Sequence, residues 1–248
     1  HSTLRGNFRS INPAQSRILL LEALDRILSH YPPKLSAKAV KALNHLGVTV
    51  HTGTVVTDVQ PDRVAIRCGD RIEVVRTCTV LWGAGVEASP LAKALGKATG
   101  AEVDRAGRVV VQPDLTLAGH PEVFVIGDMA NYSHQAGKPL PGVAQVAMQQ
   151  GRYAADLIQR RLRGAASSSF HYKDRGTMAV IGRASAVADL GWIQLSGLIA
   201  WVIWLFIHIL FLIEFQNRIL VMMQWAWNYF TRNRAARLIT GGEPTKEK

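Results

Sequence analysis

The pattern of apolar and polar positions in the first fifty residues predicts a strand, a helix and a second strand. A short apolar run at Ile18–Leu21 ends at Glu22, and a helical pattern rich in Ala and Lys covers 35–46. Gly47 then ends the helix, and 48–50 resumes an extended pattern. This order is typical of a βαβ unit.

The next part of the chain has the period of short strands. Alternating apolar positions occur at 55–59, 64–67 and 72–75, separated by Pro-Asp and Gly-Asp turn signals. We therefore expect an antiparallel meander here.

Three more apolar runs predict strands in the middle of the chain. The run 79–86 leads into a glycine-rich turn, 108–111 follows an Ala-Gly turn signal, and VFVIGD ends at Asp128. A long helix is predicted over 143–162, because strong helix formers fill this stretch after a Pro-Gly pair. The whole pattern indicates an α/β fold. A Ser-rich linker at 165–169 suggests a boundary, so that three parts are expected at 1–82, 83–164 and 165–248.

The segment 195–213 carries no charged residue. As one helix it would be about 28 Å long, just enough to span a bilayer. A second aromatic segment at 219–230 runs into a basic stretch that contains Arg232, Arg234 and Arg237. Paired aromatic segments with flanking Arg suit helices that lie in the headgroup region of an anionic membrane. A transmembrane helix and a buried core helix remain the alternatives.

Net charge and cysteine content restrict the binding partners and the cellular compartment that are expected for this chain. The formal net charge is +11, which suits nucleic acid or an anionic membrane surface. Aromatic and basic residues do not interleave as in nucleic-acid-binding motifs, so that no nucleic acid is expected. Cys68 and Cys78 are too few for a disulfide framework or a tetrahedral metal site, which favours a reducing compartment. The chain opens without Met and without a signal-peptide pattern, and we expect a cut through a longer protein.

Two acidic residues follow apolar strands. Glu22 could accept hydrogen bonds from a nucleotide ribose, or it could be a solvated acid at the start of a helix. Asp128 could bond a ribityl or ribose hydroxyl at the carboxyl edge of the sheet, or it could cap the next turn. Gly83 to Gly85 would allow backbone to approach a cofactor closely, or would simply form a tight turn.

The helix predicted after Gly142 offers a second candidate surface. Gln145 and Gln149 are four residues apart and share one helical face, with Ala144 and Ala147 leaving room for a flat neighbour. The N-terminal N–H groups and dipole of this helix suit the electron-rich edge of a reduced flavin. The alternative is a pair of solvated glutamines.

Six segments, taken in order, resemble the type II (alternative) NADH dehydrogenases, which are flavoproteins with two dinucleotide-binding domains. They are RILLLEALDRIL, VLWGAGVEASPL, VFVIGDMA, PGVAQVAMQQG, YKDRGTMAVIGRASAVADL and AWVIWLFIHILFLIEFQNR. The similarity covers nearly all of residues 1 to 240. It implies a partial Rossmann-like fold with C-terminal membrane-associated helices. By the same resemblance, 1–82 is the remainder of an NADH-binding domain, 83–164 belongs to an FAD-binding domain, and 165–248 contributes the quinone site and the membrane anchor.

The resemblance also assigns residues. Glu22 matches the acid that holds the adenosine ribose of NADH, which argues against NADPH because a carboxylate would repel a 2′-phosphate. Asp128 matches the acid that bonds the FAD ribityl chain. The implied cofactor-binding residues are Glu22, Gly83, Ala84, Gly85, Gly127, Asp128, Ala144, Gln145 and Val146. The residues implied at the quinone approach are Gln145, Gln149 and Lys173.

The implied activity is electron transfer from NADH through FAD to a membrane quinone, without proton pumping. The implied setting is the cytoplasmic face of the cell membrane, with a homodimer as the expected assembly. The family's glycine-rich phosphate-binding motifs are not in this chain, so that the chain alone is expected to bind FAD weakly and to have little activity. The rival functions are a sulfide:quinone oxidoreductase, which would need redox cysteines, and a non-catalytic membrane-binding module.

Overall fold

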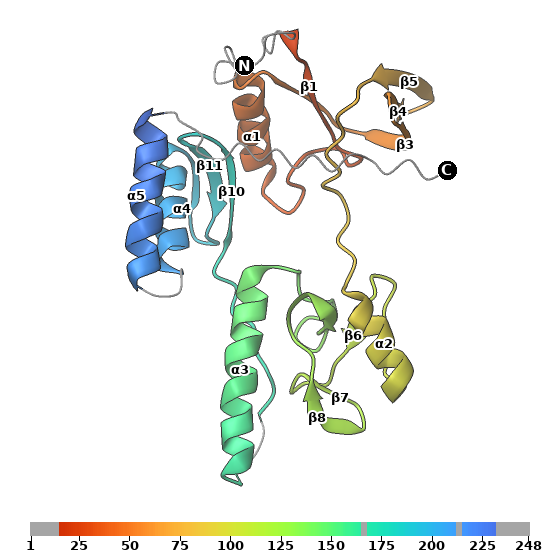
Figure 1. Ribbon diagram of the computed structural model, residues 1–248, viewed down its shortest axis with the longest axis vertical. Coiled ribbons are helices and arrows are strands. Elements are labelled where there is room, and N and C mark those ends of the chain that lie inside the picture. The colour runs from red at the N-terminus through yellow and green to blue at the C-terminus, as the bar shows by residue number, and fades with distance from the viewer. Residues whose placement is uncertain (1–14, 165–167, 212–214, 232–248) are drawn as a thin grey trace, which may run out of the picture. The chain divides into compact units, whose positions relative to one another are not determined.

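The computed structural model describes residues 15–164, 168–211 and 215–231 (Figure 1). It divides the chain into two compact units. Unit 1 contains the described residues up to Thr79 and those from Gly176 onward, and unit 2 is Val80–Arg175. The second break thus falls at 175/176, where the sequence pattern suggested 164/165. The difference has a physical reason, because Phe170 and Tyr172 are buried in the core of unit 2.

The first half of unit 1 confirms the two predictions made for it. The βαβ unit consists of β1 (Ile18–Leu21), α1 (Pro33–His45) and β2 (Val48–His51), and its two strands pair in parallel. Gly47 follows α1 with φ +84°, a conformation that glycine adopts without strain. The antiparallel meander consists of β3 (Thr54–Gln60), β4 (Arg63–Cys68) and β5 (Arg71–Arg76).

The second half of unit 1 is an antiparallel sheet with a helix on each face. The sheet consists of β10 (Thr177–Gly182), β11 (Ser185–Asp189) and β12 (Gln194–Gly197), with β11 in the middle. Successive side chains of a strand point to opposite faces. Val187 accordingly packs with α1, whereas Ala186 and Ala188 pack with Ala200 of α4 (Leu198–Leu210). Figure 1 shows β10 and β11 between these two helices.

The apolar C-terminal segment differs from the single helix predicted over 195–213. Its first residues form β12, which pairs with β11, and Gly197 turns the chain into α4 with φ +75°. At about 1.5 Å per residue, α4 is roughly 20 Å long. Among the helices of the described residues, none is both long enough and apolar enough to cross a membrane. α5 (Phe215–Thr231) follows, and the three arginines of the basic stretch lie outside the described residues.

Unit 2 is built from short strands and two helices. Its elements are α2 (Pro90–Thr99), β6 (Val109–Val110), β7 (Thr116–Leu117), β8 (His120–Phe124), the 3-10 turn η2 (Gly127–Met129), β9 (Ala130–Asn131) and α3 (Ala144–Leu162). The prediction of α3 is confirmed, and the strand predicted at 108–111 is present in shortened form as β6. The strand predicted to end at Asp128 ends at Phe124, because Gly127 turns the chain with φ +68°.

The strand predicted at 79–86 is wrong. No described strand pairs with this segment, and the side chain of Leu81 is 93% exposed. The apolar side chains of the segment therefore have no sheet to join within the described chain. The core of unit 2 is formed instead by α2, β6, β7, β9, α3 and adjoining segments. Its buried residues are Ala88, Ala92, Val109, Val111, Leu115, Leu117, Val125, Ala130, Tyr132, Val146, Phe170 and Tyr172.

Candidate functional site

Glu22 lies at the carboxyl end of β1, where the sequence pattern placed it. Its N–H donates to the carbonyl of His51 at 2.9 Å, which continues the parallel pairing with β2. Its Oε1 accepts the N–H of Leu24 at 2.9 Å. The carboxylate is thus oriented by its own turn at the edge where α/β sheets bind nucleotides, and an oriented acceptor of this kind suits a ribose hydroxyl.

The glycine-rich segment from Gly83 to Gly85 is exposed and irregular. Gly85 has φ +75°, and a Cβ added to Gly83 would meet no described atom within 4 Å. Glycine is therefore favoured at Gly85 by the positive φ of the backbone and not by a lack of space for a side chain. The segment leads into α2, whose first turn is capped where the Oγ of Ser89 accepts the N–H of Leu91 at 3.3 Å.

The Gly127–Asp128 turn is fixed by α3. The N–H of Gly127 donates to Oε1 of Gln150 at 2.7 Å, and the Gln150 side chain is 1% exposed. A Cβ added to Gly142 would lie 3.3 Å from Oδ1 of Asp128. The carboxylate of Asp128 therefore lies beside the loop that enters α3, and glycine at 142 allows this close approach.

The start of α3 lies next to this carboxylate. Val143 precedes the helix in an extended conformation, and no side chain among the described residues caps it. Ala144 is exposed, Val146 is buried, and Oε1 of Gln145 is inaccessible to solvent. An uncapped helix N-terminus beside a carboxylate offers N–H donors and an acceptor on one surface. This donor set fits a flavin, whose ring edge accepts hydrogen bonds and whose ribityl chain donates them.

Gln149 and Lys173 are joined by two hydrogen bonds. Nε2 of Gln149 donates to the carbonyl of Lys173 at 2.9 Å, and the N–H of Lys173 donates to Oε1 of Gln149 at 3.0 Å. The side chain of Gln149 is thus bound to the backbone of Lys173. The Lys173 residue itself is exposed. Two residues that the family resemblance assigned to one site therefore lie in contact.

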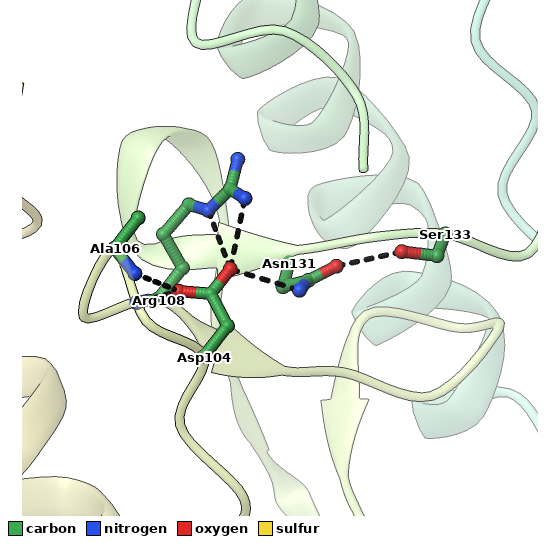
Figure 2. Close-up of polar contacts among 5 residues, drawn as sticks. All are labelled: Asp104, Ala106, Arg108, Asn131 and Ser133. Carbon is green, nitrogen blue, oxygen red and sulfur yellow. Dashed lines mark hydrogen bonds and ion pairs between the residues drawn. The ribbon is translucent and has the colours of Figure 1, made fainter. Parts of the chain in front are cut away.

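A polar network centred on Asp104 connects the residues just before β6 to β9. Oδ1 of Asp104 accepts the N–H groups of Ala106 and Arg108, while Oδ2 accepts the guanidinium of Arg108 and Nδ2 of Asn131 (Figure 2). Asn131 accepts in turn from the hydroxyl of Ser133 at 2.7 Å. Burial raises the pKa of Asp104, but the hydrogen bonds and charge of Arg108 and the N–H of Ala106 lower it further than burial raises it. The net pKa of Asp104 is lowered, and its hydrogen bond to Asn131 reaches β9, which begins two residues after Asp128.

The sequence reasoning missed Gln150. The signal was present in the helical pattern, because the buried positions of α3 are Val146, Gln150, Ala154 and Leu157. A polar residue in such an apolar stripe needs a buried partner. Here the partner is the backbone of Gly127.

Two family models match this chain. The model of the pyridine nucleotide-disulphide oxidoreductases matches residues 9–151, and that of the NDH2 C-terminal domain matches residues 175–233. The chain belongs to the type II NADH dehydrogenase family. The family resemblance noted in the sequence is thereby confirmed.

Curated members of the type II NADH dehydrogenase family are similar over most of this chain. The type II NADH:quinone oxidoreductases Ndh and NdhA of Mycobacterium tuberculosis are 39% and 40% identical, each over 96% of this chain and 51% of its own length. The chain thus spans about half the length of these relatives. A solved structure of NDH2 from Plasmodium falciparum in complex with NADH has a TM-score of 0.74 at 16% identity, and the match covers 86% of this chain and 58% of that one. This likeness is one of fold, and it confirms the predicted α/β, Rossmann-like class.

Proposed function

We propose that the protein containing this chain is an FAD-dependent NADH:quinone oxidoreductase. The observation that carries the proposal is the position of α3, which binds the Gly127–Asp128 turn through Gln150 and the backbone of Lys173 through Gln149. When bound, FAD would supply the redox chemistry, in which NADH, quinone and one proton are converted to NAD⁺ and quinol. The names of the curated relatives support the same activity.

In this proposal the residues of the chain bind and orient the reactants. Glu22 accepts hydrogen bonds from the adenosine ribose of NADH, and Asp128 accepts them from the ribityl chain of FAD. The backbone from Gly83 to Gly85 borders the cofactors, and the first turn of α3 faces the flavin ring. Gln145, Gln149 and Lys173 line the approach of quinone.

We further propose that α4 and α5 lie on an anionic lipid surface. Several of their apolar side chains are more than half exposed, namely Leu198, Ile199, Phe206, Leu210, Met223 and Trp227. The rings of Trp204 and Trp225 stack at 5.7 Å between centroids with planes 2° apart, which joins the two helices. An exposed apolar face on a protein with a formal charge of +11 supports contact with anionic lipid. A surface-bound enzyme would take quinone directly from the bilayer.

The cysteines do not favour the rival function, a sulfide:quinone oxidoreductase. Cys68 ends β4 of the meander and Cys78 follows β5, and both are free and exposed. Neither belongs to unit 2, which contains the Gly127–Asp128 turn. Neither cysteine is part of the segments proposed to hold FAD.

The test uses the protein translated from its complete reading frame. The purified protein should show the visible bands of bound flavin, and addition of a soluble quinone should accelerate its oxidation of NADH. Asp128→Ala should lower the amount of FAD that copurifies, and Glu22→Ala should raise the KM for NADH several-fold. Asp156→Ala, which removes an exposed carboxylate of α3, is the matched control. A colourless protein, or a flavoprotein that does not react with NADH, would refute the proposal.

The lipid proposal has a separate test. Vesicles of phosphatidylglycerol should bind the protein more strongly than vesicles of phosphatidylcholine, and salt should weaken the difference. Phe206→Ser should reduce binding to both, because it removes exposed apolar area. Equal binding of the two lipids, or binding that is unaffected by Phe206→Ser, would contradict it.

A further inference from the structure

The segment 168–173 crosses unit 2 without strand pairing and is held by side chains. Phe170 donates its N–H to the carbonyl of Pro113 at 2.8 Å and accepts at its own carbonyl from the hydroxyl of Tyr132 at 2.5 Å. Tyr153 donates its hydroxyl to the carbonyl of Ser168. The backbone polar groups of this segment are therefore satisfied largely by side chains of the surrounding elements.

The last two residues of the segment lie between two glutamines. Nε2 of Gln135 donates to the carbonyl of Tyr172 and Oε1 accepts its N–H, both at 2.9 Å. Gln149 makes the same pair of hydrogen bonds with Lys173. In an extended chain the N–H and carbonyl of one residue point to one side and those of the next residue to the other. The two amides thus replace the two neighbouring strands of a sheet, and we call Gln135 and Gln149 the glutamine clamp.

Both halves of the glutamine clamp come from fixed supports. Gln149 projects from α3. Gln135 follows Tyr132, whose ring is 2% exposed and meets the rings of His134 and Phe170 edge-on at 5.2 and 5.3 Å. A ring nitrogen of His134 is also 2.7 Å from the carbonyl of Val111. The backbone at Tyr172 and Lys173 is thus hydrogen-bonded from two sides, by Gln135 and by Gln149 of α3.

We propose that Gln135 and Gln149 are positioning residues that set the place of the Lys173 ammonium group for quinone reduction. This inference rests on the proposed function, in which Lys173 lines the quinone approach. Gln135 has no role in that proposal, so it tests the inference cleanly. A long, flexible side chain such as lysine can hold a defined position only if its backbone is defined, because its own rotamers are many.

The experiment compares Gln135→Ala, Gln149→Ala and Lys173→Met in the complete protein. Gln135→Ala should raise the KM for quinone by about fivefold to tenfold. The free energy that corresponds to this change is about the net contribution of one hydrogen bond. The rate of NADH oxidation by a soluble one-electron acceptor, and the flavin spectrum, should not change. In the Lys173→Met background, Gln135→Ala should add less than about a twofold change, since the group it positions is already absent.

Amide exchange and two further variants distinguish an effect on the backbone at Tyr172 and Lys173 from a failure to fold. Amide hydrogen exchange should accelerate at Tyr172 in Gln135→Ala and at Lys173 in Gln149→Ala. Gln135→Glu keeps the side-chain volume and one acceptor but loses the donor to the Tyr172 carbonyl, and it should raise the KM in the same direction if the alanine variant fails to fold. Gln159→Ala, an exposed glutamine of α3, is the matched control.

The outcomes separate the two proposals. An unchanged quinone KM in Gln135→Ala, or an increase that persists in full with Lys173→Met, would show that the clamp only supports the fold and would overturn the inference. A wild-type protein that does not pass electrons from NADH to quinone would refute the proposed function itself.

Discussion

A central segment of each unit is stabilised by a different kind of contact. In unit 1, the middle strand β11 packs through apolar side chains on both faces, with Val187 against α1 and Ala188 against α4. In unit 2, the segment 168–173 is stabilised mainly by hydrogen bonds from tyrosine and glutamine side chains. Apolar packing is strong and without direction, whereas hydrogen bonds are weaker and depend on angle. The residues proposed to bind FAD and quinone lie in unit 2, where side-chain hydrogen bonds stabilise the segment 168–173.

The largest effect is expected in the apolar contacts of unit 1. Leu35 of α1 is 1% exposed beneath the sheet, and Leu35→Ala should destabilise unit 1 by about 2–5 kcal/mol through lost burial and the cavity that remains. Tryptophan fluorescence during urea unfolding measures this, because all tryptophans of this chain except Trp82 belong to unit 1. Leu24→Ala is the control, since Leu24 is 52% exposed, and an equal loss in both variants would contradict the account.

The opposite face of the same sheet should resist added volume. Ala188 is fully buried against Ala200, and these small side chains bring α4 close to β11. Ala188→Leu should therefore destabilise unit 1 by about 1–3 kcal/mol through overpacking. Ala37→Leu on the exposed side of α1 should be nearly neutral in the same assay. If Ala188→Leu were neutral as well, the close approach of α4 would not be required.

In unit 2 a single hydrogen bond should have a comparable effect. Gln150→Ala leaves the N–H of Gly127 without its buried partner, which costs about 1–3 kcal/mol. Amide exchange at Gly127 should accelerate by the corresponding factor, and the copurified FAD should decrease because the turn of Asp128 loosens. Gln159→Ala provides the exposed comparison. Unchanged exchange at Gly127 would mean that the bond does not hold the turn.

The same difference between the units explains what the sequence could predict. The βαβ unit, the meander and α3 follow from local periodicity, and the structure confirms them. The helix predicted over 195–213 does not begin as expected, because residues 194–197 pair with β11. Apolar pattern alone does not distinguish a buried strand from the start of a helix.

The side-chain hydrogen bonds of unit 2 could not be predicted from the sequence pattern. Gln135 and Tyr172 are 37 residues apart, and nothing local to either residue indicates the other. Glu22, Asp128, Gln149 and Lys173 were selected by motif, and the roles assigned to them remain proposals. The contact between Gln149 and Lys173 came from the fold, as did the buried role of Gln150.

The smallest effect, and the one that depends on pH, is expected at the Asp104 network. Asp104→Asn keeps the shape and the acceptor for Ala106, but it places an amide against Arg108 and removes the charge that orders Asn131. Loss of these charged hydrogen bonds should destabilise unit 2 by about 1–2 kcal/mol at neutral pH. The measurement is urea unfolding followed by circular dichroism at several pH values.

The sign of the pH effect follows from the lowered pKa of Asp104 in the folded protein. A carboxyl group whose folded pKa lies below its unfolded value, about 3.9, stabilises the fold above that value, and the contribution is lost as pH falls through the folded pKa. The difference between wild type and Asp104→Asn should therefore be constant from pH 7 to about pH 5 and shrink in more acidic solution. Asp156→Asn, at an exposed site on α3, should show no such difference. A wild-type advantage that persists undiminished at pH 2 would mean that the variant is destabilised by the amide donor placed against Arg108 and not by the loss of the Asp104 charge.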